Sequence, residues 1–377
     1  MSHPKLNKDR VLILVNHDVV IYNFRKELVE RLLGEGYEVF ISSPQGERIH
    51  DLVNMGCKYV EATVERRSLN PIAEHKLLNY YERIIAEINP GVVLTYTVKP
   101  NIYGGLACQK LNVPYIVNIT GLGTALENKG FLQAILIRLY RKAVRNAACL
   151  FFQNTENRDF FASKKIYGKK QRLIPGSGVN LDHFSVLEYP EDTTINFTFI
   201  SRIMKEKGID QFLEAAKEVK ARRPDTTFHV CGFCEEPYEE RLSQLDGKGI
   251  IKYHGMVMDI REILSETHCT VHPTYYPEGI SNVLLESAAC GRPLITTDRS
   301  GCREVVDNGV NGFLVRPKDT QAIVNAICEF LDLDHTQKVE MGRAARRKVE
   351  SGFDRKTVVD AYMEEIEISN SIRNRYK

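Results

Sequence analysis

The chain of 377 residues is too long for one hydrophobic core and suits two domains of ordinary size. No apolar run approaches the roughly 20 residues of a membrane-spanning helix, and the N-terminus is polar, so neither an anchor nor a signal peptide is expected. The net charge is only +2, but residues 1–190 hold 25 Lys and Arg against 18 Asp and Glu. This basic half suits an anionic lipid diphosphate or membrane surface, whereas no motif points to nucleic acid as a partner.

Nine cysteines are scattered along the chain. An odd number of cysteines in a chain without an export signal indicates a reducing compartment rather than a disulfide framework. We therefore expect a cytoplasmic protein.

Both halves of the chain alternate short β-branched or aromatic runs with helical patterns, which is typical of parallel sheets with crossover helices. In the first half we expect strands at 11–18, 38–43, 58–63, 92–97, 115–120 and 149–154. In the second half we expect strands at 195–201, 226–232, 250–255, 269–275 and 293–298. These runs are apolar almost throughout, which predicts burial on both faces. The expected fold class is α/β, with two doubly wound, Rossmann-like domains.

Glycine, aspartate, proline and charged residues interrupt the alternation at 176–193. We place the domain boundary in this segment, so that a first domain spans 1–187 and a second spans 188–356. From Asp319 onward the pattern is helical. Ligands are expected at the carboxyl ends of the strands, where doubly wound sheets bind them.

Polar residues follow several predicted strands of the first domain. His17 and Arg25 come after the first strand, Lys99 after the fourth, and Thr120 and Gly121 after the fifth. His17 is a candidate general base or acceptor ligand, although histidines at strand ends are often structural. We assign Arg25 and Lys99 to acceptor binding as well.

Residues 129–147 form a basic amphipathic pattern in which apolar side chains recur near helical spacing. Such a helix can lie at an anionic membrane surface, and Arg138 and Arg141 within it are candidates for holding an acceptor diphosphate. A second basic cluster, at 164–172, favours the membrane interpretation. The alternative is an ordinary helix that covers the sheet.

Four charged residues of the second domain follow its strands. Arg202 and Lys207 come after the first strand, where both can meet a diphosphate. Glu278 follows a later strand, and Glu286 lies beyond seven intervening residues in the next helix. One carboxylate can bind sugar hydroxyls and the other a ribose diol. The alternative is a surface turn with two solvated acids.

The helix after Glu278 opens near Ser281. Its first backbone N–H groups, at about Ile280 to Asn282, can bind an anion, and Gly279 allows close backbone approach. Together with the two cations, these amides can stabilise the charge that grows on a leaving diphosphate.

Asp332-Leu333-Asp334 has the spacing of an Asp-x-Asp metal motif. It lies between two late helical stretches rather than after a central strand, so we assign it a helix-end role. We expect no metal site and no metal cofactor.

A resemblance to a known family lies in the run that contains both glutamates, HPTYYPEGISNVLLESAACGRPLITTD. It is similar to the donor-site signature of the retaining glycosyltransferases of family 4, which have the GT-B fold. A second donor motif and an interdomain segment of that family resemble SRIMKEKGIDQFLEAA and GSGVNLDHF. Members that build bacterial capsular polysaccharide or lipid-linked oligosaccharides are similar at TVKPNIYG and NITGLGTAL.

The resemblance implies roles for individual residues. Glu278 would contact the donor sugar and Glu286 the ribose hydroxyls, while Arg202 and Lys207 complete the catalytic set. Met256 lies in a segment similar to the one that cradles the base, and uracil is the commonest base in this subgroup.

Two positions depart from the family pattern. Many relatives have a glycine pair near His17, and many have a donor-binding histidine where Thr120 stands. Thr120 cannot act as a base, so we assign Thr120 and Gly121 to donor binding, the glycine through its backbone.

The resulting hypothesis is a retaining, metal-independent GT-B glycosyltransferase, with two domains facing a cleft and the last helix, about 357–377, returning to the first. It would move a hexose or N-acetylhexosamine from a UDP-sugar, its co-substrate, to a polyprenyl-diphosphate-linked saccharide. It would work at the cytoplasmic face of a membrane, bound peripherally. The alternatives are a transferase with a soluble small-molecule acceptor, a nucleotide-sugar hydrolase or epimerase, and a non-catalytic partner subunit.

Overall fold

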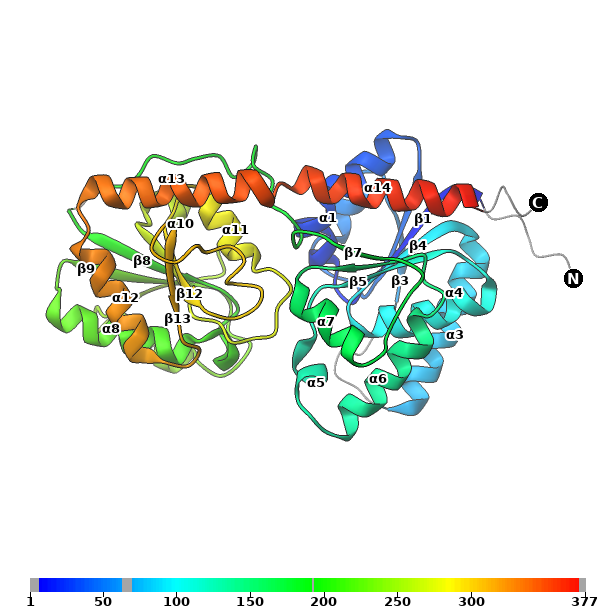
Figure 1. The fold of residues 1–377 in the computed structure, drawn as a ribbon, viewed down its shortest axis with the longest axis horizontal. Coiled ribbons are helices and arrows are strands. Elements are labelled where there is room, and N and C mark those ends of the chain that lie inside the picture. The colour runs from blue at the N-terminus through cyan, green and yellow to red at the C-terminus, as the bar shows by residue number, and fades with distance from the viewer. Residues whose placement is uncertain (1–6, 63–69, 192, 373–377) are drawn as a thin grey trace, which may run out of the picture. The chain divides into compact units, whose positions relative to one another are not determined.

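A computed structural model describes residues 7–62, 70–191 and 193–372, and it divides the chain into two compact units (Figure 1). Unit 1 comprises Met1–Ser177 and Arg355–Lys377, and unit 2 comprises Gly178–Asp354. The first division therefore lies before the expected boundary at 187/188. The reason is that the chain after Gly178 already bonds within unit 2, since the N–H of Val179 donates to the carbonyl of Phe353 at 2.8 Å.

Unit 1 contains a seven-stranded parallel sheet in the order β3-β2-β1-β4-β5-β6-β7. Its strands are β1 (Asn7–Leu14), β2 (Glu38–Ser43), β3 (Lys58–Glu61), β4 (Pro90–Tyr96), β5 (Tyr115–Ile119), β6 (Cys149–Phe152) and β7 (Gln171–Leu173). Six of these correspond to expected strands. The edge strand β7 was missed, because its three residues Gln-Arg-Leu have no apolar pattern.

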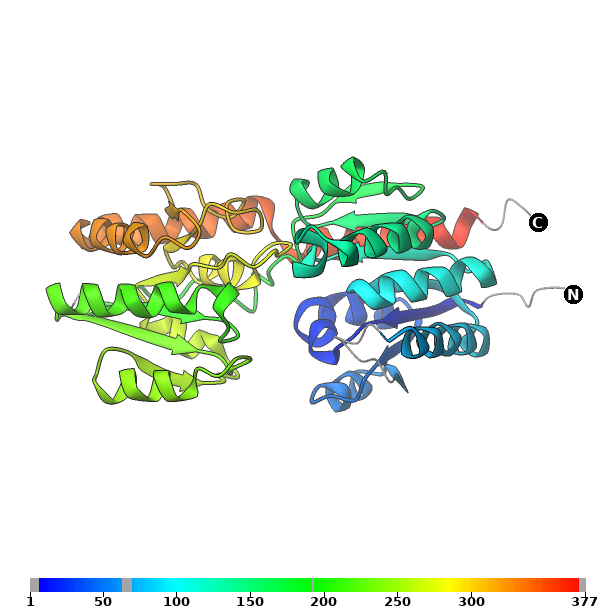
Figure 2. The same ribbon diagram turned by 90° about the horizontal axis from the view of Figure 1, so that it is seen from below.

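The helices of unit 1 cover both faces of this sheet (Figure 2). They are α1 (Asp18–Gly34), α2 (Ile49–Asn54), α3 (Pro71–Ile88), the π-helix η1 (Pro100–Gly104), α4 (Gly105–Leu111), α5 (Gly123–Glu127), α6 (Phe131–Val144), α7 (Thr155–Ser163) and α14 (Arg355–Ile372). Alternate residues of β1 enter opposite cores. Leu12 and Leu14 pack with α3, α4 and α6, whereas Val11 and Ile13 pack with α1 and α14. Burial on both faces explains the near-continuous apolar strands.

Unit 2 contains a six-stranded parallel sheet in the order β10-β9-β8-β11-β12-β13. Its strands are β8 (Ile195–Ile200), β9 (Thr226–Cys231), β10 (Lys252–Gly255), β11 (Cys269–His272), β12 (Leu294–Thr297) and β13 (Gly312–Val315). The sequence patterns predicted all except β13, another edge strand. It is short and stands among turn residues, so no alternation marks it.

The helices of unit 2 are the 3-10 turn η2 (Lys205–Lys207), α8 (Ile209–Arg222), α9 (Glu239–Gly247), α10 (Ile260–Glu266), α11 (Asn282–Ala289), α12 (Thr320–Asp332) and α13 (His335–Gly352). Asp332 ends α12, and Asp334 caps α13 by accepting a hydrogen bond from the N–H of Gln337 at 2.8 Å. The Asp-x-Asp run therefore has the helix-end role expected of it. No described helix is long and apolar enough to cross a membrane.

The two sheets share one topology. In each, the chain builds outward on one side of the first strand and then crosses to the other side, so that β1 pairs with β4 and β8 pairs with β11. Such a reversal of strand order leaves a crevice at the carboxyl ends of the two central strands, where doubly wound proteins bind ligands. We call these two places the unit 1 switch point and the unit 2 switch point.

Candidate functional site

The unit 2 switch point brings together residues that are far apart in the sequence. Lys207 follows β8, and Glu278 follows β11, the strand paired with β8. The two side chains form an ion pair and are only 10% and 14% exposed. The structure therefore places the predicted cation and the predicted sugar-binding acid in one enclosed cluster.

Besides Lys207, two side chains lie close to the carboxylate of Glu278. The hydroxyl of Thr274 donates to its Oε1 at 3.3 Å, and Nε2 of His272 lies 3.7 Å from the same oxygen. Burial by itself would raise the pKa of Glu278, but the charge of Lys207 outweighs it and holds that pKa well below its usual range. Glu278 is therefore an ionised carboxylate at neutral pH, able to accept hydrogen bonds from hydroxyl groups.

Local backbone geometry fixes Lys207 in this position. Gly208 ends η2 in the left-handed region with φ 80°, and a Cβ there would lie 2.2 Å from the carbonyl oxygen of Pro273. Only glycine lets the two segments approach this closely. The N–H of Tyr275 also donates to the carbonyl of Glu206 at 2.9 Å, which ties η2 to the chain after β11.

Arg202 contacts the same aromatic ring as Lys207. Its guanidinium is 5.8 Å from the ring centroid of Tyr276, and Nζ of Lys207 is 5.1 Å from the same centroid. Arg202 also forms an ion pair with Glu235, which follows β9. Burial raises the pKa of Tyr276, so its hydroxyl stays protonated. The two predicted diphosphate-binding cations thus share one ring, and each has a carboxylate partner.

Helix α11 supplies backbone amides close to this cluster in sequence. Gly279 and Ile280 are buried, and the N–H of Ser281 donates to the carbonyl of Gly301 at 2.8 Å before the helix begins. The first turn of a helix leaves N–H groups without intrahelical partners, and these favour an anion. Oδ1 of Asn282 is buried and has no hydrogen-bond partner among the described residues. Glu286 lies one turn further along α11, partly exposed.

Met256 follows β10, the edge strand of the sheet, and its side chain is exposed. Its side chain could therefore contact the base of a nucleotide. No described contact connects Met256 with the cluster around Glu278. Its role in holding the base stays a prediction.

The unit 1 switch point carries His17 after β1 and Lys99 after β4. Lys99 donates to Oε1 of Glu74 at 2.6 Å, and these side chains are 11% and 13% exposed. His17 is exposed beside Asp18. Both residues lie at the edge where acceptor ligands were expected.

Arg25 does not lie where its predicted role requires. Its side chain is buried in unit 1, with the guanidinium 5.3 Å from the ring centroid of Tyr96 and 5.4 Å from that of Tyr362. The sequence places Arg25 shortly after the first strand, but Tyr362 of α14 packs against its guanidinium. Acceptor binding by Arg25 is therefore corrected to a packing role.

Thr120 and Gly121 follow β5, at the same edge of the sheet. Gly121 has φ 147°, and both residues are partly exposed. Arg138 and Arg141 are exposed on α6, and Nε of Arg141 donates to the carbonyl of Lys164 at 2.7 Å. Donor binding by the first pair and acceptor binding by the second remain predictions.

Two family models match this chain. A model described as glycosyl transferases group 1 matches residues 194–333, and one described as glycosyl transferase 4-like matches residues 10–154. The chain belongs to the GT-B glycosyltransferases. This confirms the family resemblance, and the two parallel sheets confirm the fold class.

Similar proteins support the same family over most of the transferase. It is 25% identical to the N,N'-diacetylbacillosaminyl-diphospho-undecaprenol alpha-1,3-N-acetylgalactosaminyltransferase of Campylobacter jejuni, over 94% of this chain and 97% of that protein. It is also 25% identical to the UDP-Gal:alpha-D-GlcNAc-diphosphoundecaprenol alpha-1,3-galactosyltransferase of Escherichia coli, over 76% and 78%. The structure of Anabaena Alr3699/HepE in complex with UDP and glucose matches with TM-score 0.79 and 16% identity, over 95% and 99%, which shows the shared fold.

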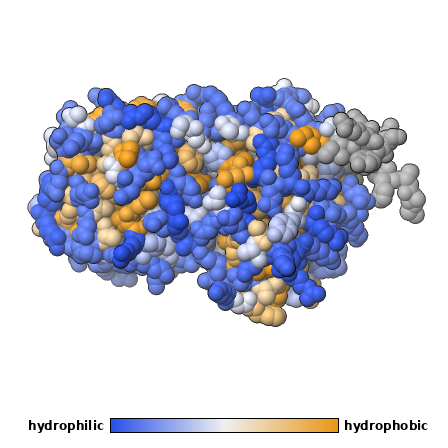
Figure 3. Space-filling view, in the orientation of Figure 1, coloured by the Kyte–Doolittle hydropathy of each residue, from blue (hydrophilic) through white to orange (hydrophobic). Residues whose placement is uncertain are grey.

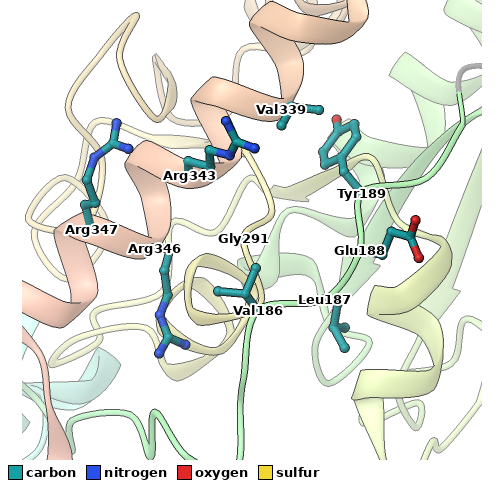
Figure 4. Close-up of a pocket in the computed structure, with 9 residues that line it drawn as sticks. All are labelled: Val186, Leu187, Glu188, Tyr189, Gly291, Val339, Arg343, Arg346 and Arg347. Atoms are coloured by element: carbon teal, nitrogen blue, oxygen red, sulfur yellow. The ribbon is translucent and has the colours of Figure 1, made fainter.

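A groove of about 470 Å³ lies elsewhere in unit 2 of the transferase (Figure 4). The segment Val186–Tyr189 runs along one side of it, and Val339 and Arg343 of α13 lie on the other. Gly291, which also lines it, precedes β12, so the groove is at the amino end of that strand. None of the predicted site residues lines this groove, and ligands of doubly wound sheets bind at the opposite ends of the strands.

Several residues of the clusters were missed by sequence reasoning. His272 and Tyr276 lie in the run that carries Glu278, yet nothing in the run shows that they face it. Glu235 and Glu74 come from other strands and helices and pair with predicted cations. A usable signal was His272 itself, because a histidine that ends an apolar strand is placed at the ligand-binding edge.

Proposed function

We propose that this glycosyltransferase moves a hexose or N-acetylhexosamine from a UDP-sugar, with retention of configuration, to a polyprenyl-diphosphate-linked saccharide. The observation that carries the proposal is the enclosed Lys207–Glu278 pair at the unit 2 switch point. The two curated relatives support the acceptor class, because both names specify an undecaprenyl-diphosphate-linked sugar. A donor of the UDP class is supported by the name of the Escherichia coli enzyme and by the UDP in the Anabaena complex.

The donor chemistry follows from the charges at this site. As the sugar–diphosphate bond breaks, negative charge grows on the leaving group, and Arg202, Lys207 and the first amides of α11 would offset it. Glu278, held ionised, would accept hydrogen bonds from the sugar hydroxyls, and Glu286 from the ribose. Fixed cations and amides can supply this stabilisation, so we propose a reaction that proceeds without a divalent metal.

Retention is inferred from the family that the donor signature resembles. The sugar would be attacked from the face that the diphosphate leaves, and the departing phosphate would help to accept the proton of the acceptor hydroxyl. Both curated relatives are named as alpha-1,3 transferases. The same outcome here would be an α-linked product from an α-linked UDP-sugar.

We further propose peripheral association with the cytoplasmic face of a membrane through α6. Its buried side packs on the sheet through Leu136, Ile137 and Tyr140. On its other side, Phe131 is 84% exposed and Ile135 is also exposed. Apolar side chains are visible at the lower end of unit 1, in the region of α5 and α6 (Figure 3). The helix is therefore both a packed helix and an amphipathic one.

The exposed side of α6 is basic beyond these two apolar residues. Arg138, Arg141 and Lys142 are exposed along it. Apolar side chains at one end and cations along the rest suit insertion into an anionic surface. The second basic cluster, at 164–172, offers fewer unpaired charges for membrane binding than its sequence suggested, because Lys170 and Arg172 pair with Glu365 of α14.

The experiment that tests the reaction measures nucleoside diphosphate release from a panel of nucleotide sugars in excess EDTA. Each sugar is assayed with and without a polyprenyl-diphosphate-linked saccharide extract, and the anomeric configuration of any product is read by NMR. We expect release from one UDP-sugar only when the lipid is present, with an α-linked product.

Other results would favour the alternatives. Release without any acceptor would indicate a hydrolase or epimerase, and transfer to a water-soluble saccharide alone would indicate a soluble acceptor. Binding of UDP without turnover would indicate a partner subunit. Complete loss of activity in EDTA would contradict the metal-free reaction.

A further inference from the structure

The start of α1 holds a carboxylate–imidazole pair. Oδ1 of Asp18 lies 3.1 Å from Nδ1 of His17. The side chain of Asp18 is 1% exposed, whereas that of His17 is 47% exposed. One member of the pair is therefore enclosed within unit 1, and the other faces solvent at the unit 1 switch point.

The loop after β2 holds Asp18 in place. The backbone N–H of Arg48 donates to Oδ2 of Asp18 at 2.6 Å, whereas the contact with His17 is made by Oδ1. Gly46 passes so close that a Cβ there would lie 2.1 Å from Oδ1 of Asp18. A side chain at residue 46 would displace the carboxylate. The carboxylate thus has one oxygen fixed by the loop and the other directed at His17.

Electrostatics decides how the ring of His17 meets this oxygen. An ionised carboxylate can only accept hydrogen bonds, and a buried one without enough donors is costly. A proton on Nδ1 of the neutral ring would give this oxygen, 3.1 Å away, a donor. Nε2 would then keep its lone pair and serve as a hydrogen-bond acceptor on the exposed ring.

His17 is available for a ligand in two further respects. It is the N-cap residue of α1, yet its side chain makes no capping hydrogen bond. It also follows β1, which pairs with β4 where the strand order of the sheet reverses. The Lys99–Glu74 pair lies after β4 at the same switch point. A group with a hydroxyl to donate would find an acceptor at Nε2.

We propose that Asp18 is a positioning residue that presents Nε2 of His17 to a hydroxyl group of the acceptor saccharide. The inference rests on the proposed function for the existence of that saccharide. The carboxylate orients the imidazole and selects its tautomer, in the way that a buried acid orients a histidine in many active sites. Gly46 belongs to the same arrangement, because it leaves room for the carboxylate.

The tautomer can be read without any substrate. The full-length protein is labelled with [15N]histidine, and two-bond nitrogen–proton NMR spectra are recorded at about pH 8.5, where an ordinary histidine is neutral. His17→Gln assigns the signal. We expect wild-type His17 to be protonated at Nδ1. Asp18→Asn keeps the shape but offers an N–H to the ring, so we expect the proton to move to Nε2.

Gly46→Ala provides a second variant that leaves Asp18 in the sequence. The added methyl group should turn the carboxylate away from His17, and the signal should become a mixture of both tautomers. A wild-type ring protonated at Nε2, or a spectrum unchanged by both variants, would overturn the proposal.

Kinetics then separates positioning from a merely structural effect. With GlcNAc-diphosphoundecaprenol as the acceptor probe, Asp18→Asn should raise the acceptor KM about tenfold, the equivalent of one hydrogen bond, and leave the UDP-sugar KM unchanged. In a His17→Gln background the same substitution should have no further effect. His50→Gln, at an exposed histidine that contacts Asn54 instead of a carboxylate, is the matched control.

The failure of this inference differs from that of the proposed function. If wild-type protein transfers sugar but Asp18→Asn acts equally in both backgrounds, Asp18 is structural and the inference fails alone. If wild-type protein uses no lipid-linked or soluble acceptor, the proposed function fails, and the acceptor role of His17 fails with it.

Discussion

The two switch points have the same strand order but different chemistry. Each has a lysine–glutamate pair of nearly equal burial, Lys99–Glu74 in unit 1 and Lys207–Glu278 in unit 2. In unit 2 the pair is joined by His272, Thr274 and a second cation, Arg202, at the ring of Tyr276. In unit 1 it is accompanied by the exposed His17. The topology therefore selects the place of each site, while the side chains after each strand select its ligand.

The charges of unit 2 suit a diphosphate and a sugar ring held in one orientation. Those of unit 1 suit a ligand that donates hydroxyl hydrogen bonds and carries a negative group. Four measurements test this division of ligands between the two units.

The largest effect is expected at Glu278. Glu278→Gln should lower kcat/KM by roughly 10²- to 10³-fold, because the sugar loses a charged acceptor and Lys207 loses its buried partner. Glu74→Gln is the counterpart in unit 1 and should act mainly on the acceptor KM. Steady-state kinetics with melting curves for both variants checks this, and full turnover by Glu278→Gln would defeat the site assignment.

As the pH falls, the free energy of unfolding of unit 2 should decrease before that of unit 1. Burial lowers the pKa of His229 to about 4 and also lowers that of His272, whereas the described histidines of unit 1 are exposed. A depressed histidine pKa means that the unfolded chain binds the proton first, so stability is complete above about pH 6.5 and declines below it.

Between pH 7 and pH 5, local opening of unit 2 should therefore increase roughly ten- to thirtyfold from His229 alone. Hydrogen exchange of the whole chain, corrected for the intrinsic effect of pH, measures it peptide by peptide. His229→Asn should remove most of the increase. Equal loss of protection in both units would contradict the expected difference.

Lys99 tests the division of ligands directly. Lys99→Met should raise the KM for a lipid-linked acceptor about tenfold and leave the UDP-sugar KM unchanged, because only uniform binding of the acceptor is lost. Lys110→Met is the matched control, since Lys110 pairs with Glu82 at 2.6 Å on the exposed surface of the same unit. A change confined to the donor KM would show that unit 1 serves the donor.

The smallest effect is expected at the surface of α6. Phe131→Ser should reduce binding to liposomes that contain anionic lipid by about threefold to tenfold at low salt, through loss of one inserted side chain. Val310→Ser, at an exposed apolar residue of unit 2, is the control. Cosedimentation measures both variants. Wild-type protein that ignores such liposomes would remove the membrane proposal.

Much of this arrangement was predictable from sequence. Eleven of the thirteen strands in the described part of the chain were expected, because strands buried on both faces have continuous apolar runs such as residues 11–14. The two that were missed, β7 and β13, are short edge strands, which need pairing on one side only. The placement of Lys207 and Glu278 at one edge followed from the rule for parallel sheets.

The contacts within the clusters were not predictable in this way. Nothing near Arg25 in the sequence indicates that Tyr362, hundreds of residues later, packs against it, so it was assigned to acceptor binding. The partners Glu235 and Glu74 were equally invisible, since each comes from an element distant in sequence.

The fold class, the family and the strand ends at which charged residues gather could be predicted from the sequence, because these depend on local patterns of polarity. Which charges pair, which are enclosed and which oxygen of Asp18 contacts His17 became visible only in the folded chain. The physical reason is that burial and hydrogen bonding are set by neighbours from other elements. An acid such as Glu278 is held ionised by a lysine 71 residues away in the chain, and no local pattern records that distance.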